Sequence, residues 1–325
     1  MDKQNRIVGG LAMIALVALV AAYFSPIWWV SLTAPNYPED AFPDGIRIHF
    51  HFDGVYNGCK AAGKGTRMAD EIIQKDLSHE DERWNPILDA QKNVDHGAEG
   101  LDCVHEMNTI NHYVGMFPID TGAPVEKPLA KFFFGFFATM IVAFAVPRKR
   151  ARLIVLATGF AAVAVWMIGD QFALGRLEAH VQHYVKEAGT FFKEPERIQG
   201  WGNNVRLISQ IVIVALIAVM GGVIAGVVRL RSFQLLLALV PALLPLFFLV
   251  TYSGWLWFFG HNLHPWGAFT VKPFMPTVFG EGKVAQFSTY SYPYWGYALL
   301  MLIFVCLMLA LLIRRKQLRE HAEME

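Results

Sequence analysis

The chain has few charged residues and only three cysteines. Lys, Arg, Asp and Glu together make up 17% of its 325 residues. It has no Cys-x-x-Cys-His sequence, which excludes covalent attachment of a c-type haem. It also lacks a Walker motif, a dinucleotide fingerprint and a His-Glu-x-x-His motif, so nothing indicates a nucleotide-dependent enzyme or a zincin. The apolar runs lack the ionisable residues expected of a proton-coupled transporter.

The apolar residues make up 54% of the chain and are gathered into long runs. A helix of roughly 20 apolar residues crosses a hydrocarbon core about 30 Å thick. Six runs reach this length, at 7–30, 129–147, 153–170, 206–228, 233–259 and 294–313. The sequence therefore predicts an α-helical integral membrane protein with six transmembrane helices, surrounded by a lipid bilayer.

Basic residues cluster at four places, near 3–6, 148–152, 229–231 and 314–319. All four lie on one side of a six-span topology, and the positive-inside rule predicts that this side, with both termini, is cytoplasmic. The first run is longer than the core of a secretory signal. We therefore expect 1–30 to be an uncleaved anchor helix, with Trp28 and Trp29 at the membrane interface.

Residues 31–127 are expected to form a small extracytoplasmic domain of mixed α and β structure. They contain 17 Asp and Glu against 8 Lys and Arg. An acidic domain attracts cations and repels nucleic acid, so no nucleic-acid partner is expected, although a solvated acidic face has the same composition. Alternation predicts a strand over 46–52 that carries His49 and His51 on one face. These two imidazoles either bind a metal together or belong to an exposed polar face of the strand.

Two of the three cysteines bound a polar stretch that contains a predicted short helix near 68–77. Cys59 and Cys103 are the only cysteines expected on the oxidising side of the membrane, so a disulfide between them is predicted. That bond removes Cys103 from the set of metal ligands. Cys306 lies in the last apolar run and is interpreted as a packing residue.

Residues 128–325 are expected to form a five-helix membrane domain with outer loops at 171–205 and 260–293. Apolar residues at helical spacing after Asp170 predict a helix that lies along the outer surface. Pro241 and Pro245 predict a kink in the fifth span. The loop that begins at Pro273 is rich in aromatic residues and is expected to pack against the outer domain.

The residues that carry chemistry are densest at 103–116. In a helix, His105, His112 and Met116 would share one face, and imidazole and thioether ligands together suit copper. Further ligands would come from the other outer histidines, namely His49, His51, His261 and His264. The alternative is that these side chains only pack the domain and form hydrogen bonds. Ten of the eleven histidines lie on the extracytoplasmic side in this topology, which favours a metal site.

The segment Asn111-His-Tyr-Val-Gly-Met116 carries a family resemblance, together with Glu106, Asn108 and Tyr37-Pro38. It resembles a motif of poorly characterised multi-pass bacterial membrane proteins associated with copper-dependent respiratory enzymes such as nitrous oxide reductase. The likeness extends to Pro273-Phe-Met-Pro276 and Val284-Ala-Gln-Phe287, but 59–103 departs from the pattern. It implies a bacterial inner-membrane location, a periplasmic outer domain and accessory work for a copper enzyme.

Three hypotheses follow. The first is a copper-handling accessory protein or subunit with a membrane or periplasmic protein partner. The second is a structural subunit of a larger membrane complex that binds no metal of its own. The third is a membrane enzyme of lipid or quinone chemistry that uses outer histidines as bases. No motif supports the third, so we expect an accessory protein rather than an enzyme.

Overall fold

The structure is a computed structural model of the chain. It describes residues 3–35, 37, 42–59, 102–265, 267–268, 271–284 and 286–324, and structural statements below concern these residues. The helix predicted near 68–77 and the histidines at positions 79 and 96 lie outside the described ranges.

Long apolar helices dominate the described residues. Five of them are long and apolar enough to cross a membrane: α1 (Lys3–Tyr23), α5 (Glu126–Ala145), α6 (Lys149–Ile168), α8 (Pro195–Arg229) and α11 (Trp295–Met324). A sixth span results if α9 (Leu236–Ala242) and α10 (Leu244–His261) are counted together. The chain is thus a helical membrane protein that associates with lipid.

The fifth predicted span is bent by 51° between α9 and α10. Pro241 lies inside α9, and Pro245 lies in the first turn of α10. Proline has no amide hydrogen, and its ring clashes with the carbonyl group four residues earlier, so two prolines this close interrupt the helix. The predicted kink is confirmed.

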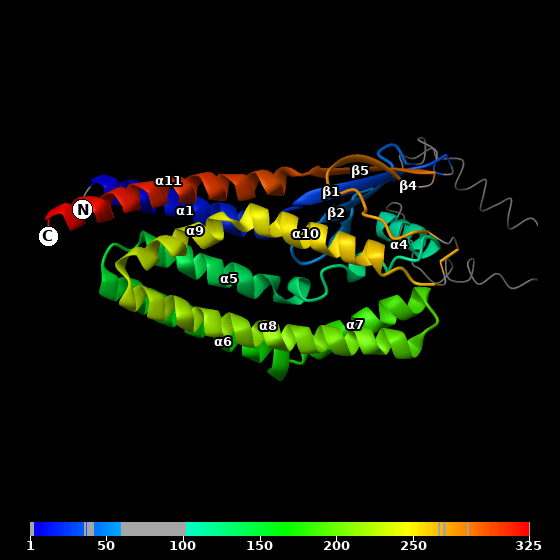
Figure 1. The fold of residues 1–325 in the computed structure, drawn as a ribbon, viewed down its shortest axis with the longest axis horizontal. Coiled ribbons are helices and arrows are strands. Elements are labelled where there is room, and N and C mark those ends of the chain that lie inside the picture. Colours follow the sequence, from blue (N-terminus) through cyan, green and yellow to red (C-terminus); the bar gives the residue numbers. More distant parts are fainter. Residues whose placement is uncertain are drawn as a thin grey trace, which may run out of the picture.

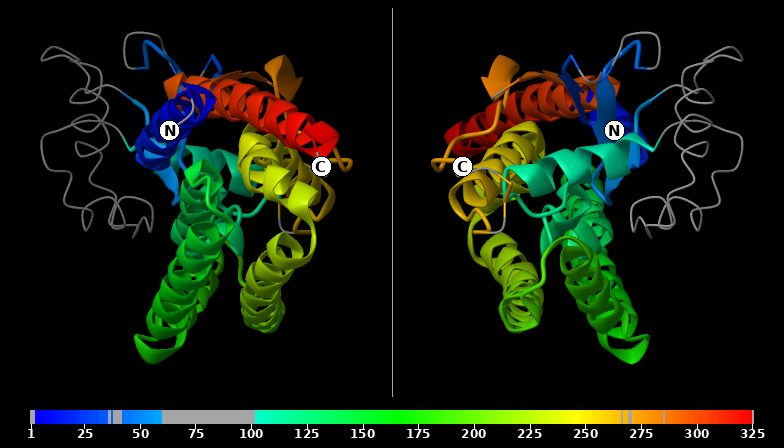
Figure 2. Two further views of the ribbon diagram at one scale, coloured as in Figure 1. Left: turned by 90° about the vertical axis from the view of Figure 1, so that its left-hand side faces the viewer. Right: turned by 90° about the vertical axis from the view of Figure 1, so that its right-hand side faces the viewer.

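The helices form three layers along the long axis of the molecule (Figures 1 and 2). Helices α1 and α11 form the first layer, α5 with α9 and α10 the second, and α6 with α8 the third. Helix α1 packs against both α11 and α5, and it carries buried alanines such as Ala15 and Ala22, small residues of the kind that permit close helix contact in membrane bundles. Apolar side chains on α6 and α8, such as Val165 and Val214, are exposed, as expected of a lipid-facing surface.

One end of the bundle carries the start of α1 and the end of α11, together with the basic turns near 146–149 and 229–231 (Figure 1). We call it the terminal end. The opposite end carries a β-sheet and two shorter helices, α4 (Cys103–Tyr113) and α7 (Arg176–Phe191), and we call it the sheet end.

The sheet joins strands from both ends of the sequence. It contains β1 (Trp28–Thr33), β2 (Ile46–Phe50), β3 (Val55–Asn57), β4 (Gly280–Val284) and β5 (Phe287–Pro293). The strand order is β3-β2-β1-β5-β4, and every pair is antiparallel. The late loop therefore packs on the early outer segment, as predicted, and does so by strand pairing.

The first predicted span is shorter than expected, because α1 ends at Tyr23 and residues 28–30 belong to β1. Pro26 disfavours helical backbone in the residue before it, and β1 finds backbone partners in β2 and β5. Trp28 is buried, and its Nε1 donates a hydrogen bond of 2.8 Å to Ser291 Oγ. The expectation that Trp28 is an interfacial anchor is wrong.

The predicted strand over 46–52 is present as β2 and ends at Phe50. The predicted helix after Asp170 is present as α7, with Leu177, Val181 and Tyr184 buried. Instead of lying along a surface, α7 runs beside α8 (Figure 1) and buries Leu177 and Val181 against Val205. Helix α8 has 35 residues, so it is about 52 Å long and exceeds the hydrocarbon thickness.

We predict that the terminal end faces the cytoplasm, because the basic turns lie there. A reporter fused after Glu325, or inserted at 148–152, should report a cytoplasmic location. A reporter inserted at 70–93 should report an extracytoplasmic one. As a control, each position is tested with two reporters, one active only in the cytoplasm and one active only outside it. The topology predicts an even number of spans between 148–152 and the C-terminus. Opposite locations for these two fusions would contradict it.

Candidate functional site

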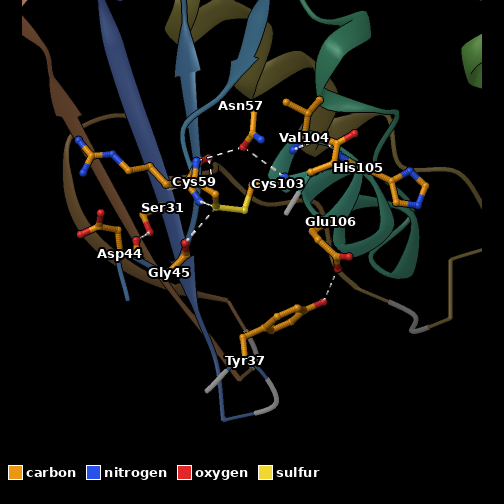
Figure 3. Close-up of a disulfide and its surroundings, with 12 residues drawn as sticks. Ser31, Tyr37, Asp44, Gly45, Asn57, Cys59, Cys103, Val104, His105 and Glu106 are labelled. Atoms are coloured by element: carbon orange, nitrogen blue, oxygen red, sulfur yellow. Dashed lines mark hydrogen bonds between the residues drawn. A yellow bond between two sulfur atoms is a disulfide. The ribbon is translucent and has the colours of Figure 1, made fainter. Parts of the chain in front are cut away.

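Helix α4 is fixed at its start by a cap and a disulfide (Figure 3). Asp102 Oδ1 accepts hydrogen bonds of 3.1 Å from the backbone amides of Val104 and His105. The predicted disulfide between Cys59 and Cys103 is present and ties the helix to the segment after β3. Cys103 is therefore unavailable as a metal ligand.

The end of α4 is set by Gly115, which has a φ of +81°. Its amide donates to the carbonyl of His112 at 3.0 Å, and the amide of Met116 donates to the carbonyl of Asn111 at 2.8 Å. These two bonds form a Schellman motif, which ends a helix with a left-handed residue. Met116 therefore lies beyond the helix. The predicted helical stripe through His105, His112 and Met116 is wrong for Met116.

Gly115 also joins α4 to the segment after α10. Its carbonyl accepts a hydrogen bond of 2.6 Å from the amide of His264. A Cβ atom on Gly115 would lie 2.6 Å from the carbonyl oxygen of His264, so only glycine permits this approach. The sequence predicted that a histidine from another loop would join this site, and the fold brings His264 to it.

The His264 ring is buried in a small aromatic cluster. It stacks on Phe192 with ring centroids 4.1 Å apart, and its Nε2 lies 3.1 Å from Glu194 Oε2. Burial lowers the pKa of His264, and this effect outweighs the opposing attraction of Glu194. The imidazole is therefore mainly neutral at neutral pH.

His112 also contacts the Phe192 ring, with ring centroids 5.2 Å apart. Its Nδ1 is buried and has no hydrogen-bond partner within the described ranges. Burial lowers the pKa of His112, and the charge of His112 in turn lowers the pKa of His264. The two imidazoles thus share one environment. We call His112, Met116, Phe192, Glu194 and His264 the Phe192 cluster.

Met116 is buried in the same apolar core as Phe192, together with Phe117 and Phe259. These side chains exclude water from the imidazoles on this side. Glu194 and Phe192, in the turn between α7 and α8, were not predicted, because the sequence offers no local signal that this turn meets α4.

The other candidate ligands lie elsewhere. His105 is exposed on α4. His112 is seven positions further along the chain, which corresponds to a rise of about 10 Å in a helix. His49 stacks on Tyr294, His51 contacts Tyr56 and His261 stacks on Trp257, with ring centroids 5.0, 4.5 and 4.6 Å apart. Within the described ranges, no three His, Cys, Asp or Glu side chains converge as metal ligands.

Several residues that carry the family resemblance have structural roles. Tyr37 OH donates to Glu106 Oε2 at 3.3 Å (Figure 3). Asn108 is buried, and its Oδ1 accepts a 2.7 Å hydrogen bond from the amide of Ile119. These contacts hold α4 against its neighbours. Asn111 differs, because its Nδ2 is buried without a partner within the described ranges.

No protein-family model, curated protein or solved structure matches the chain. The geometry of the sheet end is therefore the basis for a functional interpretation. It contains two neutral histidines beside a buried methionine and a carboxylate.

We predict that Gly115→Ala separates His264 from α4. The left-handed conformation alone costs about 1–2 kcal/mol for a residue with a Cβ atom, and the approach to His264 adds to this cost. The midpoint of thermal unfolding in detergent should fall. Gly189→Ala in α7 is the control, because a Cβ atom there meets nothing within 4 Å. An equal midpoint for the two variants would contradict the role of Gly115.

We predict that His49 makes stability depend on pH. Burial lowers its pKa from 6.5 to about 4, with smaller contributions from Arg47 and His51. Because folding favours the neutral form, its contribution is complete above about pH 6.5 and is lost as the pH falls toward 4. Between pH 7 and pH 5 the loss should be on the order of 1 kcal/mol, since solvent screens this half-buried group.

The measurement is the free energy of unfolding at both pH values in the wild type and in His49→Phe, which keeps the ring stacked on Tyr294. The pH dependence should be smaller in His49→Phe than in His105→Phe, which changes an exposed ring. Equal pH dependence in both variants would show that His49 is not responsible.

Proposed function

We propose that this protein handles copper on the extracytoplasmic face of a bacterial inner membrane, in support of a copper-dependent respiratory or oxidative enzyme. The sheet end is the extracytoplasmic face in this proposal. The supporting observation is that His264, far from His112 in the sequence, shares a buried aromatic environment with it, next to Met116.

The ligand types of the Phe192 cluster suit Cu(I). Imidazole nitrogen and thioether sulfur are neutral ligands that suit Cu(I). Magnesium and calcium prefer oxygen ligands instead. Metal binding requires an unprotonated imidazole, and the lowered pKa of His112 and of His264 keeps both neutral at neutral pH. The copper ion is the cargo of the protein here and not a resident catalyst.

Glu194 orients one of the proposed ligands, the imidazole of His264. A carboxylate beside one ring nitrogen of a histidine fixes the tautomer and the angle of the ring, as in many metal sites. Glu194 lies beside Nε2 of His264, so it orients this imidazole within the Phe192 cluster. The acidic composition of 31–127 raises the local concentration of cations around it.

A structural subunit without a metal is the second candidate. The observations in its favour are the hydrogen bonds of Asn108 and Tyr37 and the stacking of His264 on Phe192, all of which are packing contacts. In this case the protein would be purified with a larger membrane complex and would retain no copper.

We predict that the double variant His112→Ala, Met116→Leu loses Cu(I). Protein without a histidine tag is reconstituted with Cu(I) under anaerobic conditions, and retained copper is measured by elemental analysis. The wild type should retain copper, and the double variant should retain much less, because one imidazole and the thioether are removed. Leucine keeps most of the volume of Met116, so the apolar core is preserved.

The matched control is His105→Ala, His261→Ala, which removes two exposed histidines from the same end of the molecule. It should retain copper like the wild type. Thermal unfolding of each variant separates loss of ligand from loss of fold. Equal copper in the wild type and the His112→Ala, Met116→Leu variant would overturn the proposal.

A further inference from the structure

Two adjoining cavities lie between the sheet and α10. The first measures about 90 Å³ and the second about 120 Å³. Strands β1, β2 and β5, helix α4 and the residues Phe274, Pro276 and Thr277 line the first cavity. Gly54, Glu126 and Lys127 are among the residues that line the second. Both are lined by Phe50, Ile119, Tyr252 and Leu256.

The lining is mainly apolar, and the cavities are larger than a water site. A buried water needs roughly 10–15 Å³, and apolar cavities of this general scale can stay dry and bind a small ring such as benzene. The cavities are thus suited to an apolar ring or chain.

One polar group in the first cavity lacks a partner. Asn111 is 8% exposed, and its Nδ2 has no hydrogen-bond partner within the described ranges. An amide donor buried without an acceptor is unfavourable, so native proteins rarely keep one without a reason. A carbonyl oxygen in the cavity would provide the acceptor.

Glu126, Lys127 and Tyr252, which also line the cavities, are already engaged. Glu126 Oε2 accepts from Trp255 Nε1 at 3.0 Å, and Lys127 Nζ donates to the carbonyl of Asp120 at 2.7 Å. Tyr252 OH lies 3.3 Å from Ser291 Oγ. The pattern favours a neutral ligand over an anionic one.

The second cavity is lined by residues of α10, which together with α9 is apolar enough to form one membrane span. Helix α10 lines it with residues of its last turns, including Trp255, in a stretch rich in aromatic residues that is typical of a membrane interface. Thr251 lines the second cavity and is exposed on the surface of α10.

We propose that these cavities bind a neutral, membrane-soluble molecule with an apolar ring or chain and a carbonyl oxygen that accepts a hydrogen bond from Asn111 Nδ2. A quinone and an ester lipid both have this chemistry. The site shares Met116 with the Phe192 cluster but is otherwise built from different residues, and its test needs no copper.

The test uses full-length protein in nanodiscs of an ether-linked phosphatidylcholine, without copper. Decylubiquinone is the probe for a quinone, and dioctanoylglycerol is the probe for an ester lipid. Binding is measured by titration calorimetry. The wild type should bind at least one probe, and the stronger binder identifies the source of the carbonyl group.

Asn111→Leu removes the donor while keeping the volume, and it should weaken binding about 5-fold, the value of one net hydrogen bond. Leu256→Trp fills the wall common to both cavities and should abolish binding. Ile110→Phe, which fills the first cavity, is a second filling variant if Leu256→Trp does not fold. Thr109→Val, on the same helix but outside the cavity lining, should bind like the wild type.

Binding of neither probe would overturn the proposal, as would wild-type affinity in both Asn111→Leu and the folded filling variant. In those cases the cavities are packing voids, and Asn111→Leu would raise the thermal midpoint without any change in ligand binding.

Discussion

The central position of β1 is the constraint on which the sheet end depends. Its backbone pairs with β2 on one side and with β5 on the other. Strand β5 leads directly into α11, and β1 follows α1, so the pairing also sets these two helices side by side (Figure 1). The first and last apolar helices are thus joined through the sheet. The buried ring of Trp28, which donates to Ser291 on β5, ties the sheet to α10 and α11 through its contacts with Tyr252 and Tyr297.

A second long-range backbone contact depends on Gly115. Because its left-handed backbone ends α4, the chain turns back, and the carbonyl of Gly115 meets the amide of His264. This contact links the end of α4 to the segment after α10, and neither of these two segments belongs to the β-sheet. The imidazole of His264 then lies against Phe192 from the turn between α7 and α8. Three segments that are distant in sequence therefore meet around one aromatic ring.

Hydropathy predicted the helices well, because the requirement for about 20 apolar residues is local and strong. It failed at residues 28–30, where an apolar stretch continues past the helix and its strand character depends on partners near 46–50 and 287–293. The disulfide was predictable because few cysteines leave few pairings. His112 and Met116 were proposed as candidates from their chemistry, whereas Glu194 and the unpaired amide of Asn111 were not. Their roles arise from tertiary contacts that no local pattern encodes.

Helix α4 separates the two proposed sites. Asn111 lines the first cavity and His112 faces Phe192, although they are neighbours in sequence, because successive residues point about 100° apart around a helix. Met116 belongs to both environments, since it lines the cavity and packs in the core with Phe192. A ligand in the cavity that favours one position of Met116 would change the affinity of the Phe192 cluster for copper. Thermodynamic linkage then requires copper to change the affinity for that ligand by the same factor. Met116 is therefore the side chain through which a bilayer-derived molecule and a metal would influence each other.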